Sequence, residues 1–256
     1  MVRAVVLWIG HEALTLARGL SHPYSLAITL ACIAVFHQLR HEGQLTQRQA
    51  EAVVTLSNEQ GFPFWLAWGT ILRGWALAEQ GQRDEGVAQI RQGLAVYRAI
   101  GGEMMRSQFL ALVAEVYGKM GKADEGLVAL AEALAAVDKT GERRWEAELH
   151  RLKGELTLQK FQVSSSTFPV TQSKSLTAEP QSEAEACFLK AAEIARSQRA
   201  KSLELRAVMN LSRLLHQQGK KEEAHRILAE IYGWFTEGFD TADLKDAKAL
   251  LDELMN

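Results

Sequence analysis

The sequence predicts an all-α solenoid of antiparallel helix pairs, and the first observation behind this is a repeat of about forty residues. Three glycines recur at this interval, at Gly61, Gly101 and Gly141. The run Gly81-Gln-Arg-Asp-Glu-Gly86 also returns, as Gly121-Lys-Ala-Asp-Glu-Gly126. Between the glycines, apolar residues recur at three- and four-residue steps, which indicates helices. Because such a helix pair buries its apolar face only against neighbouring copies, we expect the copies to stack.

The repeat assigns residues 1–256 to one elongated domain. Val2 to Leu20 is in register with the second helix of a repeat, so residues 1–20 form a half repeat. Its exposed apolar flank predicts either that Met1 is an internal start or that something docks there. The remaining elements are repeats at about 21–60, 61–100, 101–140, 141–198 and 199–240, and a C-terminal capping helix at 241–256.

Apolar periodicity and glycine place the helices within the repeats. The first helices of successive pairs are expected at Tyr24–Arg40, Phe64–Gln80, Glu103–Met120 and Glu142–Lys160. A glycine just past a helix accepts the left-handed conformation that other residues resist. Turns are therefore expected at Gly43, Gly81, Gly121 and Gly219. The second helices repeat a small, large, small pattern, as in Gly86, Ile90 and Gly93, which allows close helix packing.

The fourth repeat is longer than the others by about eighteen residues, and the excess coincides with the segment 162–181. This segment is rich in serine and threonine and contains Pro169 and Pro180. Such a composition buries too little apolar surface to offset the entropy of ordering, so a flexible loop is expected. The alternative is a docking or phosphorylation segment.

These positions resemble the tetratricopeptide repeat (TPR) family. That family has a small residue midway along its first helix, matched here by Gly74, Ala114, Gly154 and Ser212. It also has the turn glycine and the small, large, small pattern described above. The resemblance covers nearly the whole chain and implies a right-handed superhelix that binds protein or peptide partners. The chain departs from the family in its period, forty residues against about thirty-four, and in lacking a regular proline at the repeat end.

A second resemblance concerns the C-terminal part of the chain. The segments 232–251, 141–149 and 200–206 look like the C-terminal TPR region of large bacterial signalling proteins. In those proteins a class III adenylate or guanylate cyclase module and an ATPase module precede the solenoid. The resemblance implies a sensor or scaffold role in signal transduction, and it does not transfer cyclase activity to this chain.

Composition and charge restrict the partners. The net charge of −2 provides no global field to attract phosphate backbones or anionic lipids, so neither nucleic acid nor membrane is expected as a partner. The apolar start lacks a signal-peptide cleavage site, and Leu26–Phe36 is too short to span a bilayer, so we expect a cytoplasmic protein. Cys32 and Cys187 both lie in apolar helical context and are expected to be reduced core residues.

Motifs for catalysis are missing from the sequence. It contains no phosphate-binding P-loop, no Gly-x-Gly-x-x-Gly, no Gly-x-Ser-x-Gly and no His-Glu-x-x-His, so no enzyme activity and no cofactor are expected. His37 and His41 lie four residues apart, which is a spacing that metal ligands use, but no third ligand is placed beside them. Solvated histidines at a helix end are therefore expected, with no metal.

The repeat phase also predicts a binding surface. If the first helices line a concave face, the exposed residues on that face change along the chain from aromatic, through mixed charge, to basic. Trp and Arg are frequent energetic anchors of protein interfaces. The alternative for Trp68 and Trp75 is that they fill space between repeats. The candidate partner-binding residues are Trp68, Trp75, Gln108, Glu115, Lys119, Glu148, Arg151, Glu155, Arg206 and Arg213.

Two classes of function follow from the sequence. The first is a non-catalytic interaction module that binds a protein, a peptide or the catalytic modules of a larger signalling protein. The second is a small-ligand sensor module that controls an attached or separate cyclase or ATPase. An enzyme is a weaker third hypothesis, because no motif brings catalytic groups together.

Overall fold

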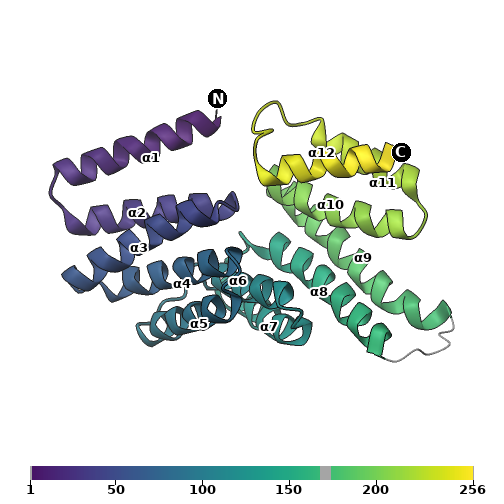
Figure 1. Ribbon diagram of the computed structural model, residues 1–256, viewed down its shortest axis with the longest axis horizontal. Coiled ribbons are helices and arrows are strands. Elements are labelled where there is room, and N and C mark those ends of the chain that lie inside the picture. Colours follow the sequence, from purple (N-terminus) through teal and green to yellow (C-terminus); the bar gives the residue numbers. More distant parts are fainter. Residues whose placement is uncertain (1, 168–173, 256) are drawn as a thin grey trace. The chain divides into compact units, whose positions relative to one another are not determined.

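The computed structural model describes residues 2–167 and 174–255, and over these ranges the chain forms α-helices and no strand (Figure 1). The predicted all-α fold class is therefore confirmed, and the short turns between helices give the helix pairs of a repeat solenoid. The helices are α1 (Val2–Gly19), α2 (Pro23–Leu39), α3 (Gly43–Gln60), α4 (Pro63–Glu79), α5 (Arg83–Ala99), α6 (Arg106–Lys119), α7 (Ala123–Thr140), α8 (Glu146–Thr167), α9 (Lys174–Ser197), α10 (Lys201–Gln217), α11 (Lys221–Tyr232) and α12 (Ala242–Met255).

The chain divides into two compact units, where the sequence predicts one continuous domain. Unit 1 comprises Met1–Val116 and unit 2 comprises Tyr117–Asn256, so the division falls inside α6.

No helix in the described part of the chain is long and apolar enough to cross a membrane.

In unit 1, each helix from α1 to α4 packs against the next one along the chain, as Figure 1 shows. The helices α4 and α5 approach each other closely where two glycines face each other. A Cβ placed on Gly74 would lie 2.6 Å from the carbonyl oxygen of Gly86, and a Cβ on Gly86 would lie 2.6 Å from that of Gly74. The two backbones can touch because neither residue has a side chain.

The turns between paired helices use left-handed residues. Gly81, Gly121 and Gly219 have φ of 94°, 74° and 79°, as expected for turn glycines. The expectation for Gly43 is wrong, since it opens α3, and the left-handed residue of that turn is His41 with φ 55°. Its amide donates a hydrogen bond of 2.9 Å to the carbonyl of Gln38, which closes the end of α2.

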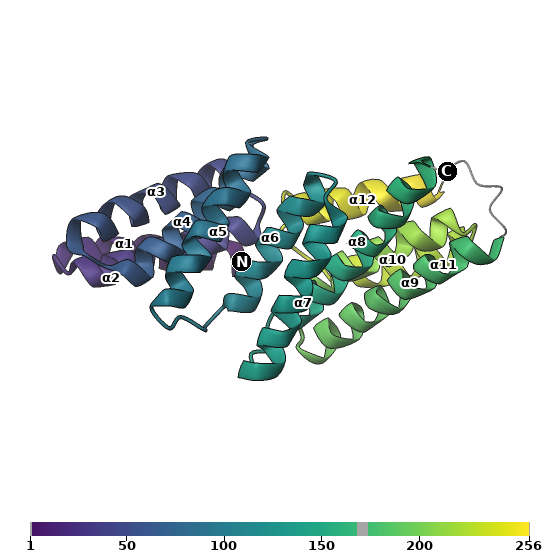
Figure 2. The ribbon, with the colours of Figure 1, turned by 90° about the horizontal axis from the view of Figure 1, so that it is seen from below.

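Unit 2 contains the long pair α8 and α9, which lie side by side (Figure 2). The expected loop at 162–181 is wrong for much of its length, because α8 continues to Thr167 and α9 begins at Lys174. The rest of that segment, 168–173, lies outside the described residues. Pro180 falls inside the first turns of α9, where the chain is already helical.

The end of unit 2 is built around α10, which packs against α9, α11 and α12. The last helix, α12, buries one apolar face formed by Leu244, Ala247, Leu250, Leu251 and Leu254. The buried side chains of α9 to α12 form a single hydrophobic cluster.

The cysteines differ in burial. Cys187 is buried, in agreement with its expected core position, whereas Cys32 is exposed, so the core assignment of Cys32 is wrong. It lies on a face of α2 that the neighbouring helices do not cover. Both thiols are free.

Candidate functional site

The two tryptophans expected on an exposed concave face are buried. Trp68 and Trp75 are 5% and 0% exposed, so the expected exposure is wrong for both. The ring of Trp68 meets Phe109 edge-on at 5.1 Å between centroids and stacks on Phe64 at 5.8 Å. The contact with Phe109 joins α4 to α6, and the side chains therefore fill space between repeats, the alternative named above.

Gln108 is also buried, at 2% exposure, so its expected exposure is wrong as well. Its amide Nε2 donates to Oε1 of Gln38 at 3.3 Å, across unit 1 from α6 to α2. Glu115, two turns further along α6, accepts a 3.1 Å hydrogen bond from the indole nitrogen of Trp75. These two residues are forty positions apart, so the bond joins equivalent positions of successive repeats.

In unit 2, the charged residues predicted on α8 bind one another. Arg151 donates to both oxygens of Glu148, at 2.7 and 2.9 Å, and to Oε2 of Glu155 at 2.7 Å. The three residues lie three and four positions apart, on one face of the helix. Only Glu155 is largely exposed, so the guanidinium of Arg151 already has carboxylate partners within its own helix.

The basic residues predicted on α10 differ in their surroundings. Arg206 donates from Nε to Oδ2 of Asp243 at 2.9 Å and thereby joins α10 to α12. Arg213 is exposed and contacts Asn210 in its own helix. Lys119 is exposed at the end of α6. Of the ten candidates, then, Lys119, Glu155 and Arg213 present exposed side chains, and partner binding by them remains a prediction.

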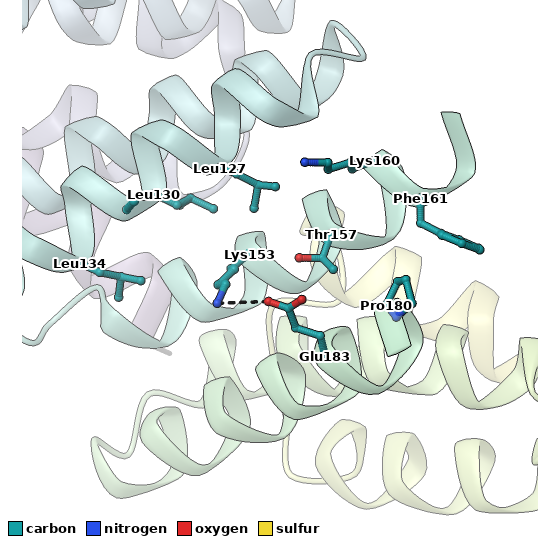
Figure 3. A pocket seen from close by; sticks show the side chains of 10 residues that line it. Leu127, Leu130, Leu134, Lys153, Thr157, Lys160, Phe161, Pro180 and Glu183 are labelled. Carbon is teal, nitrogen blue, oxygen red and sulfur yellow. Dashed lines mark ion pairs between the residues drawn. The ribbon is translucent and has the colours of Figure 1, made fainter. Parts of the chain in front are cut away.

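The structure contains a groove in unit 2 that the sequence reasoning missed. It lies among α7, α8 and α9, has a volume of about 520 Å³, and is shown in Figure 3. We call it the α7–α9 groove. It is lined by Leu127, Leu130, Ala131, Leu134, Lys153, Thr157, Lys160, Phe161, Pro180 and Glu183.

The two sides of the α7–α9 groove differ in polarity. The α7 side presents leucines, whereas α8 and α9 contribute the ion pair of Lys153 with Glu183, at 3.3 Å (Figure 3). Lys160 pairs with Asp124 at 2.6 Å. An apolar wall facing a polar rim suits a ligand that is itself amphipathic.

Two features hid this groove from the sequence reasoning. One wall belongs to a second helix, and binding residues were sought only on first helices. The other walls use the end of α8 and the start of α9, part of which was assigned to the loop at 162–181. The available signal was the seven-residue interval between Leu127 and Leu134, with the small Ala131 between them.

The histidine pair considered for metal binding does not converge on one point. His37 is turned towards Glu42, with 2.6 Å between Nδ1 and Oε2. His41 is turned towards Glu115, with 3.9 Å between Nδ1 and Oε1.

Burial raises the pKa of the Glu42 carboxyl, but hydrogen bonds and charges from His37 and Arg40 outweigh it and hold this pKa below its ordinary value.

Comparison with known proteins supports the fold. No protein-family model matches the chain. A segment of 83 residues, 32% of this chain, is 30% identical to an uncharacterised protein of Rhizobium meliloti (strain 1021), and it spans 8% of that relative's length.

Several solved structures have the same fold at low sequence identity. One is a signal transduction ATPase with numerous domains from Pyrococcus horikoshii, which carries a tetratricopeptide repeat sensor. The match covers 99% of this chain and 37% of the ATPase chain, with a TM-score of 0.62 and 14% identity. TPR-like repeats of Podosopora anserina, named after kinesin light chain, match 83% of this chain and 95% of their own, with a TM-score of 0.54 and 16% identity. The apo form of RapI matches 97% of this chain and 96% of its own, with a TM-score of 0.56 and 8% identity. The chain is therefore similar to TPR-like repeat solenoids.

Proposed function

We propose that this chain is a non-catalytic protein-interaction module, acting as a regulatory or scaffold part of a bacterial signal-transduction system related to cyclase–ATPase proteins. The α7–α9 groove is the observation that carries the proposal. Two half-buried leucines, Leu127 and Leu134, line one wall of the groove, and a partly exposed apolar strip beside charged side chains is a usual form of a peptide-binding surface.

The fold of the chain also supports this proposal. The chain shares its fold with part of a signal transduction ATPase that carries a tetratricopeptide repeat sensor, which supports a role in protein recognition. In this reading the chain recognises a protein or peptide, and any nucleotide chemistry belongs to other modules.

A matched pair of substitutions on α7 tests the groove. Leu127 lines it and is half-buried, whereas its neighbour Val128 is 70% exposed and is not among the lining residues. Leu127→Lys would place a charge in the groove, and Val128→Lys would place the same charge outside it. The two variants should have the same circular dichroism spectrum as the unmodified chain.

The assay is affinity capture from bacterial lysate with the unmodified chain and both variants as bait. A partner captured by the unmodified chain and by Val128→Lys, but lost with Leu127→Lys, would support the proposal. Equal capture by all three baits would place the binding surface elsewhere. Turnover of ATP or GTP by the purified chain would contradict the non-catalytic assignment.

The size of the groove favours one second candidate, a small-ligand sensor module that controls a cyclase or ATPase. Its volume of about 520 Å³ lies within the range of small-molecule sites, about 300–1,000 Å³. A ligand that binds only the folded chain raises its melting temperature with concentration. A saturable rise with a metabolite, abolished by Leu127→Lys, would favour this candidate over a protein partner.

A further inference from the structure

Three side chains of the kinds that bind metals meet within unit 1. They are His41, which follows α2, Glu79, the last residue of α4, and Glu115 on α6. One potential donor atom from each lies within 4.8 Å of the other two. Among the described residues this is the one group of at least three His, Cys, Asp or Glu side chains that comes so close together.

The neighbouring structure holds the side chain of Glu115 in place. The indole of Trp75, which is fully buried, donates to Oε2 of Glu115 at 3.1 Å. The other carboxylate oxygen, Oε1, is the one that lies 3.9 Å from Nδ1 of His41. A hydrogen bond to the second oxygen is the usual way in which proteins orient a metal-binding carboxylate. Glu115 is thus held with one oxygen towards the imidazole.

The group is also shielded from water. The side chains of His41 and Glu115 are 27% and 16% exposed, and Glu79 is half-buried. The ring of His41 lies 5.8 Å from that of Trp75, centroid to centroid, so an aromatic surface backs the cluster. This burial distinguishes the group from clusters of acidic side chains on an open surface.

The carboxylate of Glu42, the residue after His41, is turned towards other partners. Its oxygens lie 2.6 Å from Nδ1 of His37 and 2.9 Å from Nε of Arg40. The donor set consists therefore of one imidazole nitrogen and the oxygens of two carboxylates, contributed by three successive helix pairs.

We propose that His41, Glu79 and Glu115 bind a first-row divalent transition metal ion, with Zn²⁺ as the probe. Imidazole favours such metals over Mg²⁺ and Ca²⁺, and carboxylates complete their coordination. Zn²⁺ binds at about 2.0–2.2 Å from nitrogen and oxygen ligands, so its ligand atoms lie about 3.4 Å apart. The 3.9 Å between His41 and Glu115 needs to shorten only slightly, by rotation of side chains that are partly exposed. Water takes the remaining coordination position.

Metal binding would join the first helices of three successive helix pairs. His41 follows α2, Glu79 ends α4 and Glu115 belongs to α6, and the chain connects these three helices only through the second helices between them. An ion bound by all three stabilises the folded form of unit 1 and has little affinity for the unfolded chain, where the ligands are far apart.

Isothermal titration calorimetry of the full chain with Zn²⁺ tests the proposal. The chain is first freed of metal with a chelator, and all proteins carry Cys32→Ser so that the exposed thiol does not compete. The variants are His41→Ala and Glu79→Gln, the second of which keeps the shape of the side chain. The control is His216→Ala, because His216 also lies near a carboxylate, 3.7 Å from Glu253, without a second one grouped with it.

We expect one equivalent of Zn²⁺ to bind the unmodified chain and His216→Ala with the same affinity. His41→Ala and Glu79→Gln should each weaken binding by at least tenfold, since the loss of an outer partner alone costs about 10–100-fold. The melting temperature should rise with Zn²⁺ in the first two proteins only. Failure of the unmodified chain to bind, or equal binding by Glu79→Gln and the unmodified chain, would overturn the proposal.

Discussion

Replacing Gly74 with alanine tests the close packing of α4 against α5. An alanine Cβ would lie 2.6 Å from the carbonyl oxygen of Gly86 and 2.8 Å from the amide nitrogen of Ile90. Both are backbone atoms, so the contact can be relieved only by moving one helix away from the other. Overpacking of this kind costs about 1–3 kcal/mol.

The same substitution has a favourable part, because alanine is a better helix former than glycine by about 0.8–1.0 kcal/mol. At Gly74 the added Cβ would clash with two backbone atoms, so we expect a steric cost in the upper part of that range, about 2–3 kcal/mol. After the gain is subtracted, the variant should lose about 1–2 kcal/mol of unfolding free energy. Gly10, inside α1, is the matched control. Its added Cβ would lie 3.5 Å from the nearest atom of Ile33, an ordinary contact, so Gly10→Ala should retain the favourable part alone.

Urea unfolding followed by far-UV circular dichroism and tryptophan fluorescence measures the difference. A loss of about 1–2 kcal/mol lowers the midpoint by roughly 0.5–1 M urea at a typical slope of about 2 kcal/mol per molar. Trp65, Trp68 and Trp75 all lie on α4 and report on this helix directly. A midpoint that rises in Gly74→Ala as it does in Gly10→Ala would refute the close contact between the two helices.

Three further predictions concern unit 2 and the cysteines. Burial lowers the pKa of the His150 imidazole, so the unfolded chain binds this proton more readily. The neutral form of His150 therefore contributes fully to stability above the ordinary His pKa of about 6.5, and this contribution declines as the pH falls below that value. In His150→Gln, the midpoint of urea unfolding should change less between about pH 7 and about pH 5 than in the unmodified chain. The buried hydroxyl of Ser212 donates to a backbone carbonyl of α11 at 3.1 Å, so Ser212→Ala should cost about 1 kcal/mol in urea unfolding, whereas Ser202→Ala on the exposed face of α10 should be neutral. A thiol reagent should label Cys32 well before Cys187, which single-cysteine variants can show, and equal rates would contradict the burial of Cys187.

The helices and their turns could be predicted because their causes are local. The glycines at 81, 121 and 219 lie just past helices and adopt positive φ, and a glycine does so with little influence from distant residues. At Gly43 the same rule placed the left-handed residue two positions too late. The turn instead uses His41, whose ring lies against Trp75 and near Glu115, and both are distant in sequence.

Exposure could not be predicted in the same way. Trp68 and Gln108 occupy positions that the repeat phase assigned to an open face, yet Phe109 covers the first and Gln38 the second. Each of these contacts joins residues about forty or more positions apart, so it depends on how one repeat packs on another. The full length of α8 and α9 was not predicted either, because composition argued for a loop at 162–181, whereas α8 continues to Thr167 and α9 begins at Lys174.

The sequence by itself determined that the chain is all-α, that its pattern repeats with a period of about forty residues, and, to within three residues, where α2, α4 and α6 begin and end. Helical hydrogen bonds and turn glycines act within a few residues, so the sequence alone is enough to predict them. Only the tertiary structure decided which faces remain open and which side chains meet, namely the α7–α9 groove and the group of His41, Glu79 and Glu115. These depend on helices from different repeats, whose mutual packing is set by the sizes and shapes of many side chains together.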